Sequence, residues 1–258
     1  MKLSIIFGSI LSYLFLGTNL ALASGGYDVR GLKLNMSPDQ AQSVITNLDK
    51  DVEIFPRREF FKGLDKRQIE ETVHLVNTTY AFPRSPEKIE KISLSYARKP
   101  LDASVLTVFR SVSYRNKDRF IEPFSNSLEK KYGKASYVDK NNSRWLFLWT
   151  ADGVPKHCSK LMGMGNYDGQ LRRDPNVYYS ASEPEFIKWG DCGEVLFVRL
   201  NYNFVDGDPN KKYVQTFTQS LFNPGKMIEE YETYNSHWPK WLDNYFTKQA
   251  ESAPSPEL

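Results

Sequence analysis

The sequence has few of the residues that bind metals or form covalent catalytic sites. It contains two cysteines and three histidines (His74, His157 and His237), and their spacing matches no zinc motif. No glycine-rich stretch has the spacing and the strand-to-helix context of a dinucleotide fingerprint. We therefore expect no metal site and no cofactor, and no residue stands out as catalytic.

The sequence also lacks a large excess of charge of either sign. Its 34 basic and 31 acidic residues give a formal net charge of +3, whereas nucleic-acid-binding proteins concentrate basic charge. We expect no nucleic-acid partner. No apolar run beyond the first 23 residues is long enough to cross a bilayer, so we expect no stable membrane insertion once those residues are removed.

The first 23 residues have the pattern of a secretory signal peptide. Lys2 gives a positive start, an apolar run follows, and Ala21-Leu22-Ala23 fits the small-residue cleavage rule. This predicts cleavage before Ser24 and a mature protein that is periplasmic or secreted. The alternative is an uncleaved N-terminal anchor.

The two cysteines are Cys158 and Cys192. An even number of cysteines in an exported chain favours a disulfide. In the chain-entropy model a loop of this size contributes on the order of 3.8 kcal/mol to stability. The alternative is two reduced thiols, in which case His157 would place a base beside the Cys158 nucleophile.

Ser37 begins the most clearly specified helix. Gln40 stands three residues later, which makes a Ser-x-x-Gln capping box, and Pro38 falls at the first helical position. Apolar residues then recur at helical spacing, namely Ala41, Val44, Ile45 and Leu48. Alternating residues before this helix predict a short strand over 29–34.

Runs rich in β-branched and aromatic residues predict most of the remaining chain to be strand. These runs cover 72–82, 89–96, 105–114, 144–150, 194–204 and 213–222. The mixed stretch 51–61 contains Pro56 and is expected to be a strand or an irregular edge. Two further helices are predicted, one over 120–132 and one from Asn223 to Pro239, and 249–258 reads as a solvated tail.

Because consecutive strands can pair as hairpins, we expect an α+β fold with antiparallel sheet and packed helices. We expect one domain over 24–248, built from two similar halves, 27–114 and 115–246, in one body.

The start of the first helix carries a recognisable motif, Gly31-x-x-Leu34-x-Met36-Ser37. The motif resembles the opening of SmpA/OmlA-like and β-lactamase-inhibitor-protein-like modules. Asn35 departs from that pattern, since those modules usually have a second glycine there.

A weaker echo follows in the helix over 120–132, Gly133 and the strand that contains Trp145. The resemblance implies small units of a helix pair and an antiparallel sheet, which bind other proteins in bacterial envelopes or outside cells.

The loop from Asp152 to Gly193, which includes both cysteines, contains the predicted binding residues. It is rich in Gly, Pro, Asp, Asn and Tyr, and loops of this length are often functional. Tyr, Trp and Arg dominate the hot spots of protein interfaces. The candidates are Tyr167, Arg172, Arg173, Tyr178 and Trp189. The alternative is an ordinary loop whose aromatic residues pack on one another.

Two functions remain open. The first is an exported, non-catalytic binding or interaction protein whose partner is another envelope protein. The second is an envelope hydrolase with a dispersed site, such as Asp152, His157 and Asp191. Convergence of these three side chains in one pocket would favour the enzyme, and the absence of a catalytic signature favours the binding protein.

Overall fold

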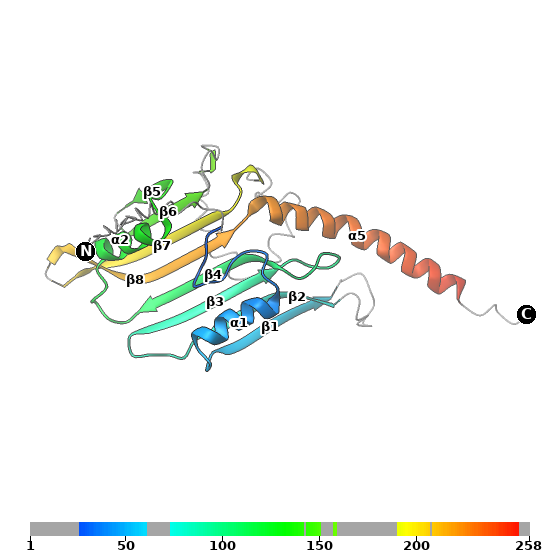
Figure 1. The fold of residues 1–258 in the computed structure, drawn as a ribbon, viewed down its shortest axis with the longest axis horizontal. Helices are drawn as coiled ribbons and strands as arrows, with labels where there is room; N and C mark the ends of the chain where they lie inside the picture. The colour runs from blue at the N-terminus through cyan, green and yellow to red at the C-terminus, as the bar shows by residue number, and fades with distance from the viewer. Residues whose placement is uncertain are drawn as a thin grey trace, which may run out of the picture.

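The computed structural model describes residues 26–60, 73–141, 143–150, 157–158, 190–206 and 208–252, with the backbone alone for Phe60 and Pro209. These residues form one eight-stranded antiparallel sheet in the order β1-β2-β3-β4-β8-β7-β6-β5 (Figure 1). The strands are β1 (Glu53–Phe60), β2 (Val73–Ala81), β3 (Lys88–Tyr96), β4 (Val105–Tyr114), β5 (Tyr137–Lys140), β6 (Arg144–Thr150), β7 (Val195–Val205) and β8 (Asp208–Phe222). The helices are α1 (Pro38–Leu48), α2 (Ile121–Tyr132) and α5 (Pro224–Glu251). The predicted α+β class is confirmed.

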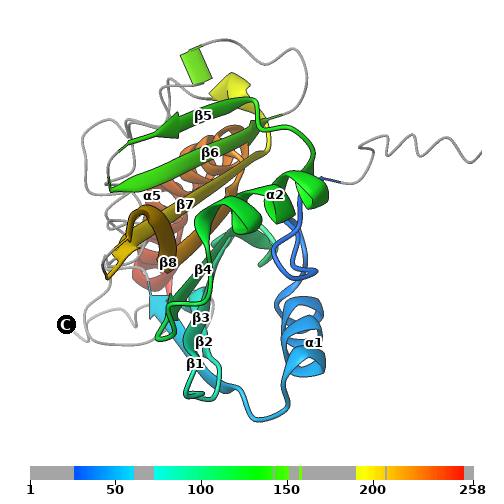
Figure 2. The ribbon, with the colours of Figure 1, turned by 90° about the vertical axis from the view of Figure 1, so that its left-hand side faces the viewer.

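Helices cover both faces of the sheet. Alternate residues of β6 point to opposite faces, and Figure 2 shows α1 and α2 on one side with α5 on the other. Trp145, Phe147 and Trp149 pack in the cluster that contains the buried residues of α1 and α2. Leu146 and Leu148 pack with Met227 of α5. Because β6 is buried on both faces, its sequence is apolar almost throughout.

The capping box of α1 is confirmed. The Ser37 hydroxyl accepts from the Gln40 amide at 3.2 Å, and the Gln40 side chain accepts from the Ser37 amide at 2.9 Å. The strand predicted before this helix is wrong. Val29 and Leu32 exchange two backbone hydrogen bonds across a tight turn. Gly31 adopts a φ of 84° in that turn, which suits glycine.

The predicted hairpins are confirmed, since β3 pairs with β4 and β7 pairs with β8. β1, which contains Pro56, lies at an edge of the sheet, where a missing N–H is tolerated. The order of elements repeats once, because α1 and α2 are each followed by four strands, and β4 and β8 join the two sets. A shared order of helices and strands does not show that the two halves have similar structures, so their similarity stays a prediction.

α5 begins as predicted and ends later than predicted. Asn223 caps it by accepting from the Lys226 amide at 3.2 Å, but the helix continues through Pro239 to Glu251 (Figure 1). A proline inside a helix costs about 3 kcal/mol. Buried Trp238 and the stacked rings of Trp241 and Tyr245 lie on either side of that position and offset this cost.

The start of the predicted tail, 249–251, is therefore helical and exposed. Among the described residues, no helix has the length and apolarity needed to span a bilayer.

Candidate functional site

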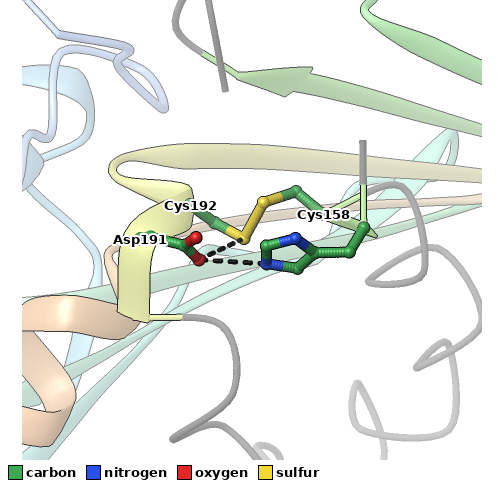
Figure 3. A group of neighbouring side chains, drawn as sticks. Cys158, Asp191 and Cys192 are labelled. Carbon is green, nitrogen blue, oxygen red and sulfur yellow. Dashed lines mark hydrogen bonds and ion pairs between the residues drawn. A yellow bond between two sulfur atoms is a disulfide. The ribbon is translucent and has the colours of Figure 1, made fainter. Parts of the chain in front are cut away.

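The predicted disulfide between Cys158 and Cys192 is present (Figure 3). Both cysteines are fully buried among apolar side chains on the α5 face of the sheet. Cys192 stands just before β7, so the bond fixes residues 157–158 to the start of a central strand.

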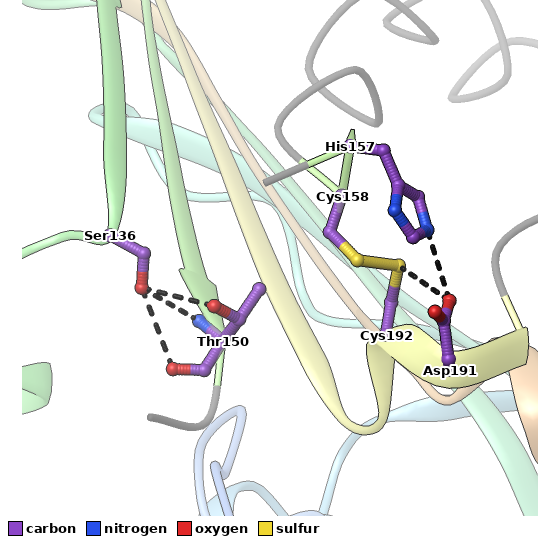
Figure 4. The surroundings of a disulfide bond; sticks show 6 residues. All are labelled: Ser136, Thr150, His157, Cys158, Asp191 and Cys192. Carbon is purple, nitrogen blue, oxygen red and sulfur yellow. Dashed lines mark hydrogen bonds and ion pairs between the residues drawn. A yellow bond between two sulfur atoms is a disulfide. The ribbon is translucent and has the colours of Figure 1, made fainter. Parts of the chain in front are cut away.

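The disulfide brings two residues of the hypothetical hydrolase site together. His157 Nε2 lies 3.0 Å from Asp191 Oδ1 (Figure 4), and their side chains are 39% and 56% exposed. The Ser136 hydroxyl in the same view bonds to Thr150 and has no bond to His157. Asp152, the third predicted member, lies outside the described residues, so the convergence of the three stays a prediction.

The proposed binding loop also lies outside the described residues. This applies to Tyr167, Arg172, Arg173, Tyr178 and Trp189. Their role in partner binding stays a prediction from composition.

A second site, which the sequence reasoning missed, lies on the opposite face of the sheet. Arg110 of β4 pairs with Ile92 of β3 and with Gln219 of β8, and directly paired residues share a face. Glu90, two residues from Ile92, therefore faces the same way. Polar residues on three neighbouring strands thus interrupt the apolar layer under α1 and α2.

Glu90 is the centre of this polar group. Its side chain is 1% exposed, and its carboxylate accepts from Arg30 at 2.7 Å, Lys88 at 2.7 Å and Arg110 at 2.8 Å. Burial alone would raise the pKa of Glu90, but the three cations, Arg110 foremost, lower its pKa to about 2. At neutral pH one carboxylate faces three cations, which leaves an excess of two positive charges.

A chain of hydrogen bonds connects Arg110 to α2. Arg110 donates to the Gln219 side chain at 3.1 Å, and Gln219 donates to the Tyr132 hydroxyl at 3.0 Å. Tyr132 in turn donates to the Asp28 carbonyl at 3.0 Å. Arg110 also lies 5.2 Å from the centre of the Phe217 ring. These contacts fix the direction of the guanidinium.

The polar group opens into a pocket of about 330 Å³, bordered by α2 and by β4 and β8, a volume at the lower end for small-molecule sites. Its described lining contains four cations and no acidic side chain: Arg30, Arg110, Arg119 and Lys131. The apolar wall consists of Tyr114, Phe124, Leu128, Tyr132 and Phe217. We call this site the cationic pocket.

The four cations differ in how well they are neutralised. Lys131 pairs with Asp28 at 3.0 Å. Arg119 lies 3.9 Å from Glu87 and 3.8 Å from Asp118, at the limit of an ion pair and largely exposed, so these contacts add little. Arg119 therefore keeps most of its charge, but half of its side chain is exposed to water. The less exposed part of the positive excess lies around Arg30 and Arg110, which share Glu90.

A signal for this pocket was present in the sequence. In β4 the inward positions read Val108, Arg110, Val112, and in β3 Glu90 precedes Ile92. A charge within an inward apolar series is costly unless it is paired, and such positions tend to be functional. Knowing that the two charges are neighbours still requires the strand pairing.

Comparisons of the chain with protein families, curated proteins and solved structures find no match. The resemblance to SmpA/OmlA-like and β-lactamase-inhibitor-protein-like modules therefore stays a prediction.

Proposed function

We propose that the protein is an exported, non-catalytic binding protein whose ligand occupies the cationic pocket. The ligand is a small molecule that carries an anionic group on an apolar body. The observation that carries this proposal is the ratio at Glu90, where one buried carboxylate accepts from three cations. An anion in the pocket would neutralise the positive charge that the single carboxylate of Glu90 does not neutralise.

The arrangement suits an anion better than a neutral ligand. Guanidinium groups present several N–H donors in a fixed plane that matches carboxylate and phosphate oxygens. Arg110 uses Nε for Glu90 and Nη1 for Gln219, so Nη2 keeps its donors for a ligand. The partly buried position, with 17% of the Arg110 side chain exposed, weakens screening by water.

The apolar wall specifies the rest of the ligand. Phe124 lies 5.1 Å from Phe217 and 6.1 Å from Tyr114, measured between ring centres. These rings would pack against an aromatic or aliphatic body, while the cations hold its anionic end.

The lining favours binding over catalysis. General acid–base chemistry requires a group whose pKa lies near the working pH. The described lining contains Arg, Lys and Tyr as its ionisable residues, and no His, Cys, Asp or Glu. The predicted envelope-protein partner and the alternative of a hydrolase at His157 and Asp191 both stay predictions.

Isothermal titration with phenyl phosphate and benzoate, and with benzamide as the neutral counterpart, tests the proposal. We expect the two anions to bind and benzamide not to bind. Arg110→Gln should weaken anion binding at least about tenfold, the loss of one charge-assisted contact. The fold should survive, since Glu90 keeps Arg30 and Lys88.

Arg58→Gln is the matched control, because Arg58 is exposed on the edge strand β1. Anion binding that is equal in Arg110→Gln and wild type would show that the cationic pocket is not the site.

A further inference from the structure

We propose that Cys158 and Cys192, once reduced, form a tetrahedral Zn²⁺ site together with His157 and Asp191. This inference is independent of the cationic pocket, because the cysteines pack on the α5 face of the sheet. The protein would then exist in two mutually exclusive forms, one with the disulfide and one with the metal.

The four side chains already converge. One ligand atom from each lies within 4.8 Å of all the others. His157 Nε2 and Asp191 Oδ1 are 3.0 Å apart (Figure 4). Cys192 Sγ and Asp191 Oδ1 are 3.9 Å apart (Figures 3 and 4). Zinc bonds of about 2.0 Å to N and O and about 2.3 Å to S place tetrahedral ligands roughly 3.3–3.8 Å from one another. Small side-chain shifts therefore suffice to enclose an ion.

Two dipeptides supply the complete set. His157-Cys158 and Asp191-Cys192 each lie in a short 3₁₀ turn, and the two cysteine Cα atoms are 5.8 Å apart. Two thiolates, one imidazole and one carboxylate are ligand types that zinc accepts. The sequence alone does not indicate these four ligands, because the two dipeptides are far apart along the chain.

The surroundings favour a metal once the disulfide opens. Both cysteines are fully buried, and an isolated thiolate is unstable in apolar surroundings. Zinc would neutralise both thiolates at once. His157 and Asp191 are partly exposed on the same side of the bond, which gives the ion a path from solvent.

The two forms interconvert by thiol–disulfide exchange followed by metal binding. A dithiol donates two electrons and two protons to the bonded sulfurs of Cys158 and Cys192 and leaves as its own disulfide. Zn²⁺ then displaces one proton from each new thiol and forms two Zn–S bonds. The neutral His157 nitrogen and the Asp191 carboxylate complete the coordination. In the oxidised form the sulfurs are bonded to each other and cannot supply thiolate ligands.

The test is a titration of the full chain with Co²⁺ and Zn²⁺, before and after reduction with a phosphine that binds zinc weakly. We expect the reduced protein to bind one Co²⁺ with the absorption bands of tetrahedral thiolate coordination, and Zn²⁺ to displace it. The oxidised protein should show no such bands. His157→Ala with Asp191→Ala should lower the Zn²⁺ affinity roughly 100-fold or more, because two of four ligands are lost.

His237→Ala with Asp243→Asn is the matched control on α5, and its affinity should equal that of the wild type. A folded, reduced protein without thiolate–cobalt bands overturns the proposal. So does an unchanged affinity when both His157 and Asp191 are replaced. If reduction alone unfolds the chain, Zn²⁺ should restore the fold and raise its melting temperature, and failure to do so equally overturns the site.

Discussion

Two buried glutamates, Glu90 on β3 and Glu230 on α5, accept hydrogen bonds from different numbers of cations. Arg98 donates three hydrogen bonds to Glu230, at 2.7, 3.2 and 3.3 Å. The side chains of this pair are 5% and 0% exposed, and Arg98 lies 3.4 Å from the centre of the Tyr234 ring. Within this pair one guanidinium meets one carboxylate, and we call it the matched pair. Glu90, by contrast, accepts from three cations at the edge of a pocket.

The difference separates a structural ion pair from the proposed binding site. The matched pair ties α5 to the chain just after β3 and leaves no net charge between them. The unmatched group keeps two positive charges in excess, held in place by the same kind of contact. A buried carboxylate thus fixes the helix in one region, and in the other it orients cations that remain available to a ligand.

The largest expected effect is a loss of stability when the ion pair between Arg98 and Glu230 is broken. Glu230→Gln keeps the shape of the side chain but removes the negative charge that accepts three hydrogen bonds from buried Arg98. Breaking a buried ion pair costs about 3–5 kcal/mol. Urea unfolding followed by circular dichroism measures this loss. Glu229→Gln is the control at the neighbouring position, since its pair with Lys226 is exposed and should contribute little. Equal stability of the two variants would contradict a structural role for Glu230.

Features of the fold that depend on residues close together in the chain were predictable from the sequence. The capping box at Ser37 and the β3–β4 and β7–β8 hairpins depend on residues close together in the chain, and they are confirmed. Alternation of apolar residues predicts a strand around Gly31, and this prediction is wrong. The Asp28 side chain accepts from the Gly31 amide and closes a turn, which alternation alone does not indicate.

The features that were missed depend on long-range packing. The pairing of β4 with β8 joins the two sets of strands, and without it Arg110 cannot be placed beside Gln219. Helix α5 passes Pro239 because its rings pack beyond that residue, which a local rule for proline does not include. The disulfide was predicted from the cysteine count, whereas the adjacency of His157 and Asp191 required the fold.

The next largest effect is the loss of stability at low pH that follows from protonation of Glu90. The pKa of Glu90 is about 2 in the folded protein and about 4.5 when unfolded, so the unfolded state binds the proton first as the pH falls. The stabilisation from this carboxylate is complete above about pH 5 and is lost towards pH 2, and it amounts to roughly 3 kcal/mol. The free energy of unfolding at several pH values measures it.

Glu90→Gln isolates this contribution, because glutamine does not titrate. We expect the stability difference between wild type and variant to be constant above about pH 5 and to shrink towards pH 2. A difference that stays constant over the whole range would show that Glu90 is not the group responsible.

The smallest expected effect is a change in anion affinity. It distinguishes Glu90, which lies beside the cationic pocket, from the structural Glu230. Glu90→Gln raises the positive excess beside the pocket from two charges to three. Removing one negative charge a few ångströms from a bound anion is worth about 1–2 kcal/mol at a partly buried site, so phenyl phosphate should bind roughly tenfold more tightly while the protein becomes less stable. Titration at neutral pH measures the affinity, with Glu229→Gln as the variant that should change neither quantity. Weaker anion binding in Glu90→Gln would mean that the carboxylate acts by orienting Arg110 and not by limiting the charge of the pocket.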